Sequence, residues 1–553
     1  MKKVLSILAA TVMVVSSYAQ STFWEYTDYA GAFAPSPTAR WTDTWTNWDP
    51  QNTTYPATTV NVTGNITTNT TWTNTNVYFI DNIFVYVDSL VTLTIEPGTI
   101  IRSQGNGALI IGRGAKIMAQ GTVAQPIIFT SSQAAGARDF GDWGGVVICG
   151  AAYNNIPTSP NALCEGGIGN LTTHRGIHGG THNDDNSGVF SYVRIEYAGI
   201  PLGGPNSELN GLSLYSVGYN TQIDHVQVSY SGDDSFECFG GIQDMKYMVA
   251  FHGWDDDFDT DNGYSGRMQF GLGIRDSKFA DQSGSNGFES DNDANSSSFY
   301  PKTKAVYSNM TVIGPNWTGN PDTTNVLFKR GAHIRRNSGI SVYNSIMTGW
   351  VDAGFLIDGR KTTTNYCGDT NHIECNLVVQ IPATKYYRIA TGSDTLCLMT
   401  SAALATSMEL PANNNDTLAS TTLLMFSATN GFGNSLTDYD VRPGASSPAI
   451  GHTCWAWNTQ FVGIEDNNSV LGLTLYPNPA EGFTTLSFEA QNSGDLNISI
   501  VDLNGRVVRT INNMKYDGGK NTFQIDVQGL STGVYVVNIN MANTVKTQKL
   551  IIK

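Results

Sequence analysis

The chain has 553 residues, of which 40% are hydrophobic and only 14% are charged, whereas about 25% are charged in a typical soluble domain. This composition excludes a coiled coil and a charge-driven disordered chain, and it supplies enough apolar residues for a substantial core. The net charge is −16. Since an acidic surface repels phosphate backbones and anionic headgroups, we expect no nucleic-acid partner and no binding to a membrane surface.

The first nineteen residues have the order of a secretory signal peptide. Lys2 and Lys3 precede an apolar run over residues 4–15, and small residues follow up to Ala19. We therefore predict a signal peptide at 1–19. The apolar run is too short to span a bilayer, and no other stretch has the ~18 apolar residues that a spanning helix needs, so no transmembrane segment is expected.

The next segment, residues 20–76, is rich in tryptophan. Its rings could stack on sugars, but the segment directly precedes a repeat region whose first unit has no neighbour to cover it. We predict that the segment forms a cap over that first unit. The tryptophans are Trp24, Trp41, Trp45, Trp48 and Trp72.

The central region, residues 77–466, contains an internal repeat. Asp-Asp-Ser-Phe-Glu at 233–237 recurs 22 residues later as Asp-Asp-Asp-Phe-Asp at 255–259, and 30 residues further on as Ser-Asn-Gly-Phe-Glu at 285–289. A short strand of alternating apolar residues precedes each copy. Such a repeat predicts a right-handed parallel β-helix, because one coil cannot bury its own inward face and must stack on the next.

The central apolar residue of each repeat is expected to line the interior of this β-helix. Stacked residues of this kind belong to the core, so they carry no chemistry in this interpretation. The predicted interior ladder consists of Leu212, Phe236, Phe258, Phe288, Phe328 and Phe355.

Five segments of this region resemble a family of secreted and outer-membrane bacterial β-helix proteins, over roughly residues 77–360. That family implies no settled enzymatic activity. Residues 442–451 resemble the last coil of many β-helices, so we expect the solenoid to close near residue 466 and a linker to occupy 467–470. The five segments are 93–100, 141–147, 183–188, 192–199 and 232–237.

Acidic residues occupy equivalent positions of the repeats, so the β-helix would stack them at the ~4.8 Å spacing of adjacent strands. Two like charges at that distance cost about 0.9 kcal/mol in water and about 3.5 kcal/mol at an effective dielectric of 20. Protonation or a divalent cation relieves this cost, and Ca²⁺ fits best, since it accepts about six to eight oxygen ligands in flexible geometry. The candidate ligands are Asp233, Asp234, Glu237, Asp255, Asp256, Asp257, Asp259, Asp261 and Glu289.

Two other interpretations of these carboxylates stay open. They could cap turns by accepting hydrogen bonds from backbone N–H groups. They also resemble the acid and base of polygalacturonase-type hydrolases, although Asn210 stands where that family would have an aspartate, and Arg335-Arg336 is a poor match to its basic motif. A polysaccharide-degrading hydrolase or lyase is therefore the alternative function.

Three histidines recur every four residues, as in a transition-metal site. They are His174, His178 and His182, and the glycines between them exclude the helix that would align them. We therefore expect a surface loop without metal.

The seven cysteines all lie between Cys149 and Cys454. They allow at most three disulfides and leave one thiol unpaired. Cys367 and Cys375 are the nearest-spaced pair of the late coils, and an export route permits bonding.

Residues 471–553 alternate short strands with turns, which predicts a small Ig-like β-sandwich. The motifs Leu-Tyr-Pro-Asn-Pro at 475–479, Leu-Asn-Gly-Arg-Val-Val at 503–508 and Lys-Leu-Ile-Ile-Lys at 549–553 resemble the C-terminal sorting domain of type nine secretion cargo in Gram-negative bacteria. The resemblance implies handling by the type nine machinery and its sortase, with passage through the periplasm. The motif residues include Tyr476, Pro477, Asn478, Pro479, Gly533, Tyr535 and Lys549.

The sequence thus predicts a secreted or surface-attached β-helix protein that is exported by the type nine system. We expect it to act as a non-catalytic adhesin, binding protein or envelope protein, with a polysaccharide or another cell-surface ligand as its partner.

Overall fold

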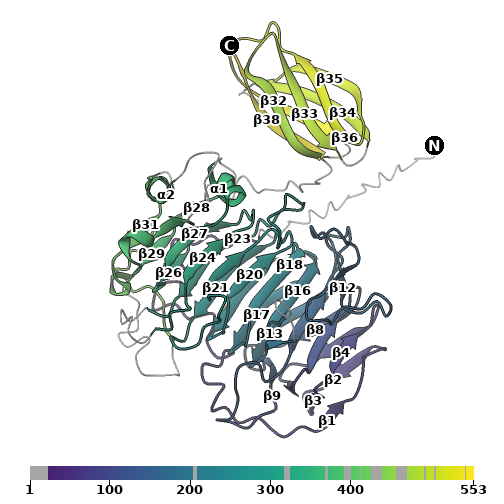
Figure 1. Ribbon diagram of the computed structural model, residues 1–553, viewed down its shortest axis with the longest axis vertical. Helices are drawn as coiled ribbons and strands as arrows, with labels where there is room; N and C mark the ends of the chain where they lie inside the picture. The colour runs from purple at the N-terminus through teal and green to yellow at the C-terminus, as the bar shows by residue number, and fades with distance from the viewer. Residues whose placement is uncertain are drawn as a thin grey trace, which may run out of the picture. The chain divides into compact units, whose positions relative to one another are not determined.

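The computed structural model contains two compact units, which divide between Cys454 and Trp455 (Figure 1). No helix among the described residues is long and apolar enough to cross a membrane. The structure describes residues 23–202, 208–316, 324–367, 371–390, 400–411, 413–424, 439–455, 470–490, 493–502, 506–541 and 544–553. The predicted signal peptide, the predicted solenoid end near residue 466 and most of the predicted linker lie outside these residues.

The first unit is a parallel β-helix, as predicted. One side of its coils is a ten-stranded parallel sheet, here called the first sheet, and the other sides form a seventeen-stranded sheet, the second sheet. The first sheet consists of β4 (Phe84–Val87), β7 (Ala108–Ile111), β10 (Gly145–Cys149), β16 (Leu212–Val217), β18 (Phe236–Gly241), β20 (Phe258–Asp261), β22 (Phe288–Ser290), β24 (Arg330–Ile334), β27 (Ala353–Ile357) and β30 (Tyr387–Ile389).

The second sheet continues each coil after a turn. It consists of β1 (Val60–Val62), β2 (Thr70–Trp72), β3 (Val77–Asp81), β5 (Thr92–Ile95), β6 (Ile100–Gln104), β8 (Lys116–Gln120), β9 (Ile127–Ser131), β13 (Gly188–Glu196), β17 (Gln222–Ser229), β19 (Met245–Phe251), β21 (Arg267–Ile274), β23 (Val306–Ile313), β25 (Ser341–Tyr343), β26 (Ile346–Thr348), β28 (Ile373–Glu374), β29 (Leu377–Val379) and β31 (Asp416–Leu418). Outside the two sheets lie β11 (Ala162–Leu163), β12 (Ile177–His178), β14 (Ile200–Pro201), β15 (Glu208–Leu209), α1 (Arg360–Cys367), α2 (Ser401–Met408) and the short 3₁₀ turns η2 (Ala383–Lys385) and η3 (Thr421–Leu424).

The long strands of the second sheet turn a corner part-way along. β13 pairs with β8 through its first half and with β9 through its second half. The corner residues Tyr192, His225, Tyr247 and Phe270 have positive φ angles between 50° and 61°, a conformation that costs about 1–3 kcal/mol for a residue other than glycine. Their rings stack with centroid distances of 4.2, 4.4 and 5.2 Å, and each such contact returns about 0.5–1.5 kcal/mol.

The interior of the β-helix is a continuous apolar core. Phe236, Phe258 and Phe288 are in register and stack at 5.5 and 5.6 Å. The next position of this ladder is Ala332, not Phe328, so the sequence prediction was wrong at that coil. Phe328 is still fully buried in the apolar core, and its ring lies 5.9 Å from the guanidinium carbon of Arg275.

Residues 23–55 form a strap along the outside of the second sheet. The strap contacts β23 through Ala32 N and Thr311 Oγ1 at 2.8 Å, and it reaches β13 through Tyr55 Oη, which donates to Glu196 at 2.8 Å. Trp45 is fully buried in it and meets Tyr192 edge to face. The prediction of a cap over the first coil was therefore wrong for four of the five tryptophans.

The strap lies there because the middle strands of the second sheet are apolar on their outer faces as well as inside. The strap covers Val249, Phe251, Leu272 and Ile274, all of which are buried. Only Trp72 belongs to the first coils, where it stacks on Tyr78 at 4.8 Å.

The segment 439–455 closes against the strap. Ala30 N donates to Ala449 O at 2.8 Å, and Tyr29 bridges to Ile450. The segment predicted as a last coil therefore pairs with the strap, and β31 is the last strand that the structure describes in the second sheet.

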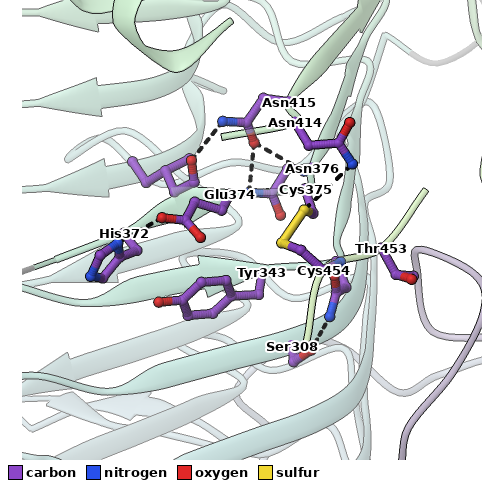
Figure 2. The surroundings of a disulfide bond; sticks show 12 residues. Ser308, Tyr343, His372, Glu374, Cys375, Asn376, Asn414, Asn415, Thr453 and Cys454 are labelled. Atoms are coloured by element: carbon purple, nitrogen blue, oxygen red, sulfur yellow. Dashed lines mark hydrogen bonds and ion pairs between the residues drawn. A yellow bond between two sulfur atoms is a disulfide. The ribbon is translucent and has the colours of Figure 1, made fainter. Parts of the chain in front are cut away.

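A disulfide ties the same segment to the coils. It joins Cys375, at the corner between β28 and β29, to Cys454, 79 residues later (Figure 2). The sequence left the pairing open, and the partner of Cys375 is not its nearest-spaced cysteine, Cys367. The chain returns to the corner at residue 454, where the Cys454 amide donates to Asn344 Oδ1 at 2.9 Å.

The second unit is a seven-stranded sandwich with its own core. Its pairings are antiparallel except between β32 and β38. Tyr476 is 79% exposed, Asn478 Oδ1 accepts from Ile551 N at 2.8 Å, and Tyr535 Oη donates to Ser531 O at 2.8 Å. The strands are β32 (Val470–Glu481), β33 (Phe483–Ala490), β34 (Gly494–Asp502), β35 (Val507–Tyr516), β36 (Gly519–Asp526), β37 (Gly533–Met541) and β38 (Thr544–Ile552).

Truncating the centre of the interior ladder should destabilise the β-helix strongly. Phe258→Ala removes a ring stacked on both sides, and we expect a loss of about 3–5 kcal/mol of unfolding free energy, measured by chemical denaturation of the full chain. Phe299→Ala is the matched control, because Phe299 is 51% exposed and a surface truncation changes stability by about 0.5 kcal/mol or less. Equal effects of the two variants would contradict the ladder.

Candidate cation-binding site

Seven carboxylates gather along the first sheet, and we call them the acidic ladder. Their side chains lie on the outer face of three successive coils, where apolar interior residues alternate with outward polar ones. They are Asp233, Asp234, Glu237, Asp255, Asp256, Asp259 and Glu289.

Part of the ladder runs along the strands themselves. Glu237 on β18 pairs in register with Asp259 on β20, which pairs with Glu289 on β22, and the next residue in the column is His333 on β24. This is the stacking that the repeat predicted. It arises because the phenylalanine directly before each of these carboxylates is fixed inside, so that the following residue must face outward.

A second column precedes the strands by two residues. Asp234 Oδ1 accepts from Asp256 N at 2.7 Å, and Asp256 Oδ1 accepts in the same way from Asn286 N. Asp234 and Asp256 are 7% and 3% exposed. Each carboxylate of this column thus accepts a hydrogen bond from a backbone N–H group of the next coil, as the turn-capping interpretation expects.

Residues of the two columns form groups of three carboxylates, here called triangles. Equivalent triangles occur on successive coils because the sequence repeats. The first joins Asp234, Glu237 and Asp259, and the second joins the equivalent residues one coil later, Asp256, Asp259 and Glu289. Within each triangle, one oxygen from each residue lies within 4.8 Å of the others. Asp259 is common to both triangles, and a third group joins Asp233 and Asp255 to Asp234.

At the two ends of the ladder, hydrogen-bond donors take the place of carboxylates. At one end, the Asn210 amide donates to Glu237 Oε2 and lies 3.3 Å from Ser213 Oγ. At the other, Asn286 Nδ2 lies 3.3 Å from Glu289 Oε2, and His333 Nδ1 is also 3.3 Å from Glu289. Glu237 and Glu289 thus each have a donor beside them, whereas Oδ1 of Asp259, which lies between them in the column, has no partner among the described residues.

The pKa values reflect this arrangement. Burial and the nearby Glu289 raise the pKa of Asp255 to about 7, and burial, Glu289 and Asp291 raise the pKa of Asp259 well above its usual range. Burial acts in the same direction on Glu289, but His333 and Arg335 outweigh it and lower its pKa. Burial and neighbouring carboxylates also raise the pKa values of Asp233, Asp234, Glu237 and Asp256 well above their usual range, so ionisation is opposed along the whole ladder except at Glu289.

Several polar atoms of the ladder have no hydrogen-bond partner within the described part of the chain. They include Oδ1 of Asp255, Asp259, Asn210 and Asn286. Asn210 is 2% exposed and Asn286 is fully buried, so each amide oxygen is removed from bulk water, which is costly for an unpaired acceptor.

Two further acids stand beside the ladder that sequence reasoning missed. Glu165 has a pKa raised to about 7 by burial and by Glu208, and the charge of Glu165 in turn raises the pKa of Glu237. Glu165 lies in the insertion 150–187 between β10 and β13, and Glu208 lies in β15. Neither residue belongs to the repeat, so no spacing signal indicated them.

Two predicted ligands do not belong to the ladder. Asp257 points into the interior, where it forms a fully buried ion pair with Arg275 at 3.2 Å. Asp261 pairs in register with Phe239, and its Oδ1 accepts from Asn262 N at 2.5 Å. Neither residue is part of the close carboxylate groups. Asp257 directly precedes β20, outside the regular alternation of the strand, whereas Asp261 lies two residues after Asp259 and therefore on the same face of β20.

The three histidines of the insertion do not converge. His178 is fully buried with its Nδ1 2.8 Å from Ser216 Oγ, and burial lowers its pKa to about 3. The side chain of His182 is 72% exposed. Within the described ranges, the close groups of metal-ligating side chains include no histidine.

Comparisons with known proteins agree with this architecture. The family described as the pectate-lyase like beta helix domain matches residues 64–421, about two thirds of the chain. The chain belongs to this family. The secretion system C-terminal sorting domain matches residues 474–553, so the protein is a type nine cargo that is exported to the cell surface or released.

No curated protein matches the chain. Among solved structures it is similar to full-length tailspike protein 2 of Escherichia coli O157:H7 bacteriophage CAB120, with 11% identity and a TM-score of 0.20, covering 86% of this chain and 64% of that one. It is also similar to the Dettilon tailspike protein, with 10% identity and a TM-score of 0.20, covering 85% of this chain and 84% of that one.

Neutralising the centre of the ladder should stabilise the cation-free chain. Asp259→Asn removes a charge near several others, and at pH 8 with chelator we expect a gain of about 1–3.5 kcal/mol in unfolding free energy. A raised pKa means that the folded chain holds protons that the unfolded chain releases, so the wild-type ladder loses stability as the pH rises through about 7, the pKa of Asp255. The gain from Asp259→Asn should therefore shrink towards pH 5.

The matched control is Asp244→Asn. Asp244 is also half-buried, but its Oδ1 accepts a hydrogen bond from Nε of Arg267 at 2.9 Å. Neutralising Asp244 should therefore lower the unfolding free energy or leave it unchanged. A destabilised Asp259→Asn variant at pH 8 would contradict the repulsion inferred for the ladder.

Proposed function

We propose that this exported protein is a non-catalytic binding protein that holds Ca²⁺ in its acidic ladder and presents the flank of the solenoid to a polysaccharide or another cell-surface ligand. The observation that carries the proposal is the pair of repeat-related carboxylate triangles that share Asp259. Asp259 has carboxylates of both triangles beside it, and its Oδ1 has no hydrogen-bond partner among the described residues, an arrangement that calls for a cation or for protons.

Calcium suits the ligand set better than magnesium does. Each triangle offers three carboxylates, which can bind in monodentate or bidentate fashion, and Ca²⁺ tolerates such irregular oxygen shells, whereas Mg²⁺ demands near-octahedral geometry. The buried amide oxygens of Asn210 and Asn286, both without a partner among the described residues, are of the type that Ca²⁺ also accepts. When bound, the cation would supply positive charge between coils whose carboxylates otherwise repel.

The same geometry disfavours catalysis. A glycosidase needs room for the sugar and its attacking group between two carboxyl groups that lie about 5–9.5 Å apart. In the triangles the carboxylate oxygens lie within 4.8 Å of each other. Arg335 is an unsuitable base for a lyase, because Glu289 and Asp291 hold its side chain in ion pairs and raise its pKa still further.

The loop that follows β22, the strand of Glu289, offers a surface for a sugar. Phe299 and Tyr300 are 51% and 47% exposed, and Asn292 Nδ2 holds the loop by donating to Phe299 O at 3.3 Å. Aromatic rings exposed in this way provide apolar faces with a polar rim, which suits stacking on a sugar ring.

Cation binding should depend on the shared carboxylate. We expect calorimetry of the full chain at pH 8 to register Ca²⁺ binding and a raised melting temperature, and we expect Asp259→Asn to weaken the binding at least tenfold. Asp244→Asn should bind as the wild type does. An absence of binding by the wild-type chain, or a melting temperature unchanged by chelator, would remove the cation from the proposal.

Ligand binding is tested separately with a polysaccharide panel of neutral and anionic polymers, each with Ca²⁺ and with chelator. We expect retention on at least one polymer without new reducing ends or unsaturated products. Product that the Asp233→Asn, Asp234→Asn double variant fails to release would establish the enzymatic alternative, and Phe299→Ala with unchanged retention would exclude the aromatic loop.

A further inference from the structure

Two cysteine thiols meet on the outer face of the first sheet, away from the disulfide of Figure 2. Cys149 is the last residue of β10, and Cys164 follows β11 in the insertion 150–187. Their sulfur atoms are 3.3 Å apart, and the residues are 0% and 4% exposed.

The insertion covers an apolar patch on the outer face of the first sheet, which would otherwise be exposed to solvent. Cys149 and Cys164 pack there with Val147, Tyr215 and Phe239. Cys164 N donates to Gly176 O at 2.9 Å within the insertion, while Cys149 pairs in register with Tyr215 on the neighbouring coil. The two sulfurs thus belong to different layers, one to the insertion and one to the sheet beneath it.

We propose that Cys149 and Cys164 form a disulfide in the exported protein, which fixes the insertion 150–187 to the outer face of the first sheet. The sulfurs would have to approach by about 1.3 Å to reach a bond length of about 2.05 Å. The export route leads through an oxidising compartment, and the Cys375–Cys454 bond already joins two segments of the same unit.

The Cys149–Cys164 bond would form by thiol–disulfide exchange. The Cys149 and Cys164 thiols lose two protons and two electrons as the sulfur–sulfur bond forms, and a protein disulfide of the periplasm takes them up and becomes a dithiol. Because both thiols are buried once the insertion has packed, exchange takes place during folding, when the sequence separation of only 15 residues keeps the two thiols close.

Cys238 provides an internal negative control. It is also buried, but it faces the interior of the solenoid, where Gln243 Nε2 lies 3.6 Å from its sulfur. Among the described residues, Cys238 forms no disulfide. The Cys375–Cys454 bond is the corresponding positive control.

The test is differential thiol labelling of the full chain recovered after export. Free thiols are alkylated in denaturant without reductant, the chain is then reduced, and the released thiols receive a second label before peptide mapping. We expect Cys149 and Cys164 to carry the second label, together with Cys375 and Cys454, and Cys238 to carry the first. A non-reduced digest should contain one linked peptide that holds Cys149 and Cys164.

The proposal is overturned if Cys149 and Cys164 carry the first label in chains whose Cys375 and Cys454 carry the second, or if either one is linked to another cysteine. Its structural consequence is measured in the Cys375→Ser, Cys454→Ser background, where reductant should speed protease cleavage within 150–187 several-fold. Adding Cys149→Ser and Cys164→Ser should abolish this dependence on reductant, whereas adding Cys238→Ser should not. Cleavage unaffected by reductant would contradict the fixing role.

Discussion

The whole β-helix depends on the need of each coil to bury its inward face against the coils on either side. A single coil of two or three short strands has too little apolar surface to form a core alone. Stacking makes the backbone register continuous, and it brings Phe236, Phe258 and Phe288 into one column. Because packing of the interior residues fixes the register of the strands, it also determines which outward residues lie next to each other on adjacent coils.

The acidic ladder is a direct consequence of this constraint. Glu237, Asp259 and Glu289 stand one residue after the stacked rings, so the same pairing that packs the rings brings their carboxylates together. Amide, imidazole and guanidinium groups lie beside Glu237 and Glu289, whereas Oδ1 of Asp259 between them has no partner among the described residues. The repulsion there opposes the hydrophobic packing beneath it, which explains why a cation at this place would serve stability and function together.

The outer faces of the coils are covered by segments that come from elsewhere in the chain. The strap 23–55 covers the apolar outer face of the second sheet, and the insertion 150–187 covers that of the first. Both covers are needed because strands such as β19 of the second sheet and β10 of the first sheet are apolar on both faces, so the solenoid alone would expose a large hydrophobic surface. The strap also joins the beginning of the unit to its end, through Ala30 and Ala449.

The sequence by itself determined the repeat, the parallel β-helix, the stacking of Glu237 on Asp259 and the sorting domain, because each of these follows from local spacing and motif order. It failed wherever distant segments meet. The 328 and 332 positions could not be told apart without the hydrogen-bond register, and Asp257 could not be separated from its acidic neighbours without knowing which face it occupies. The place of Trp45, the partner of Cys375 and the approach of Glu165 to the ladder were decided by tertiary structure alone. In each case the contact joins residues with no periodic relation, and only the packing of apolar surface selects their partners.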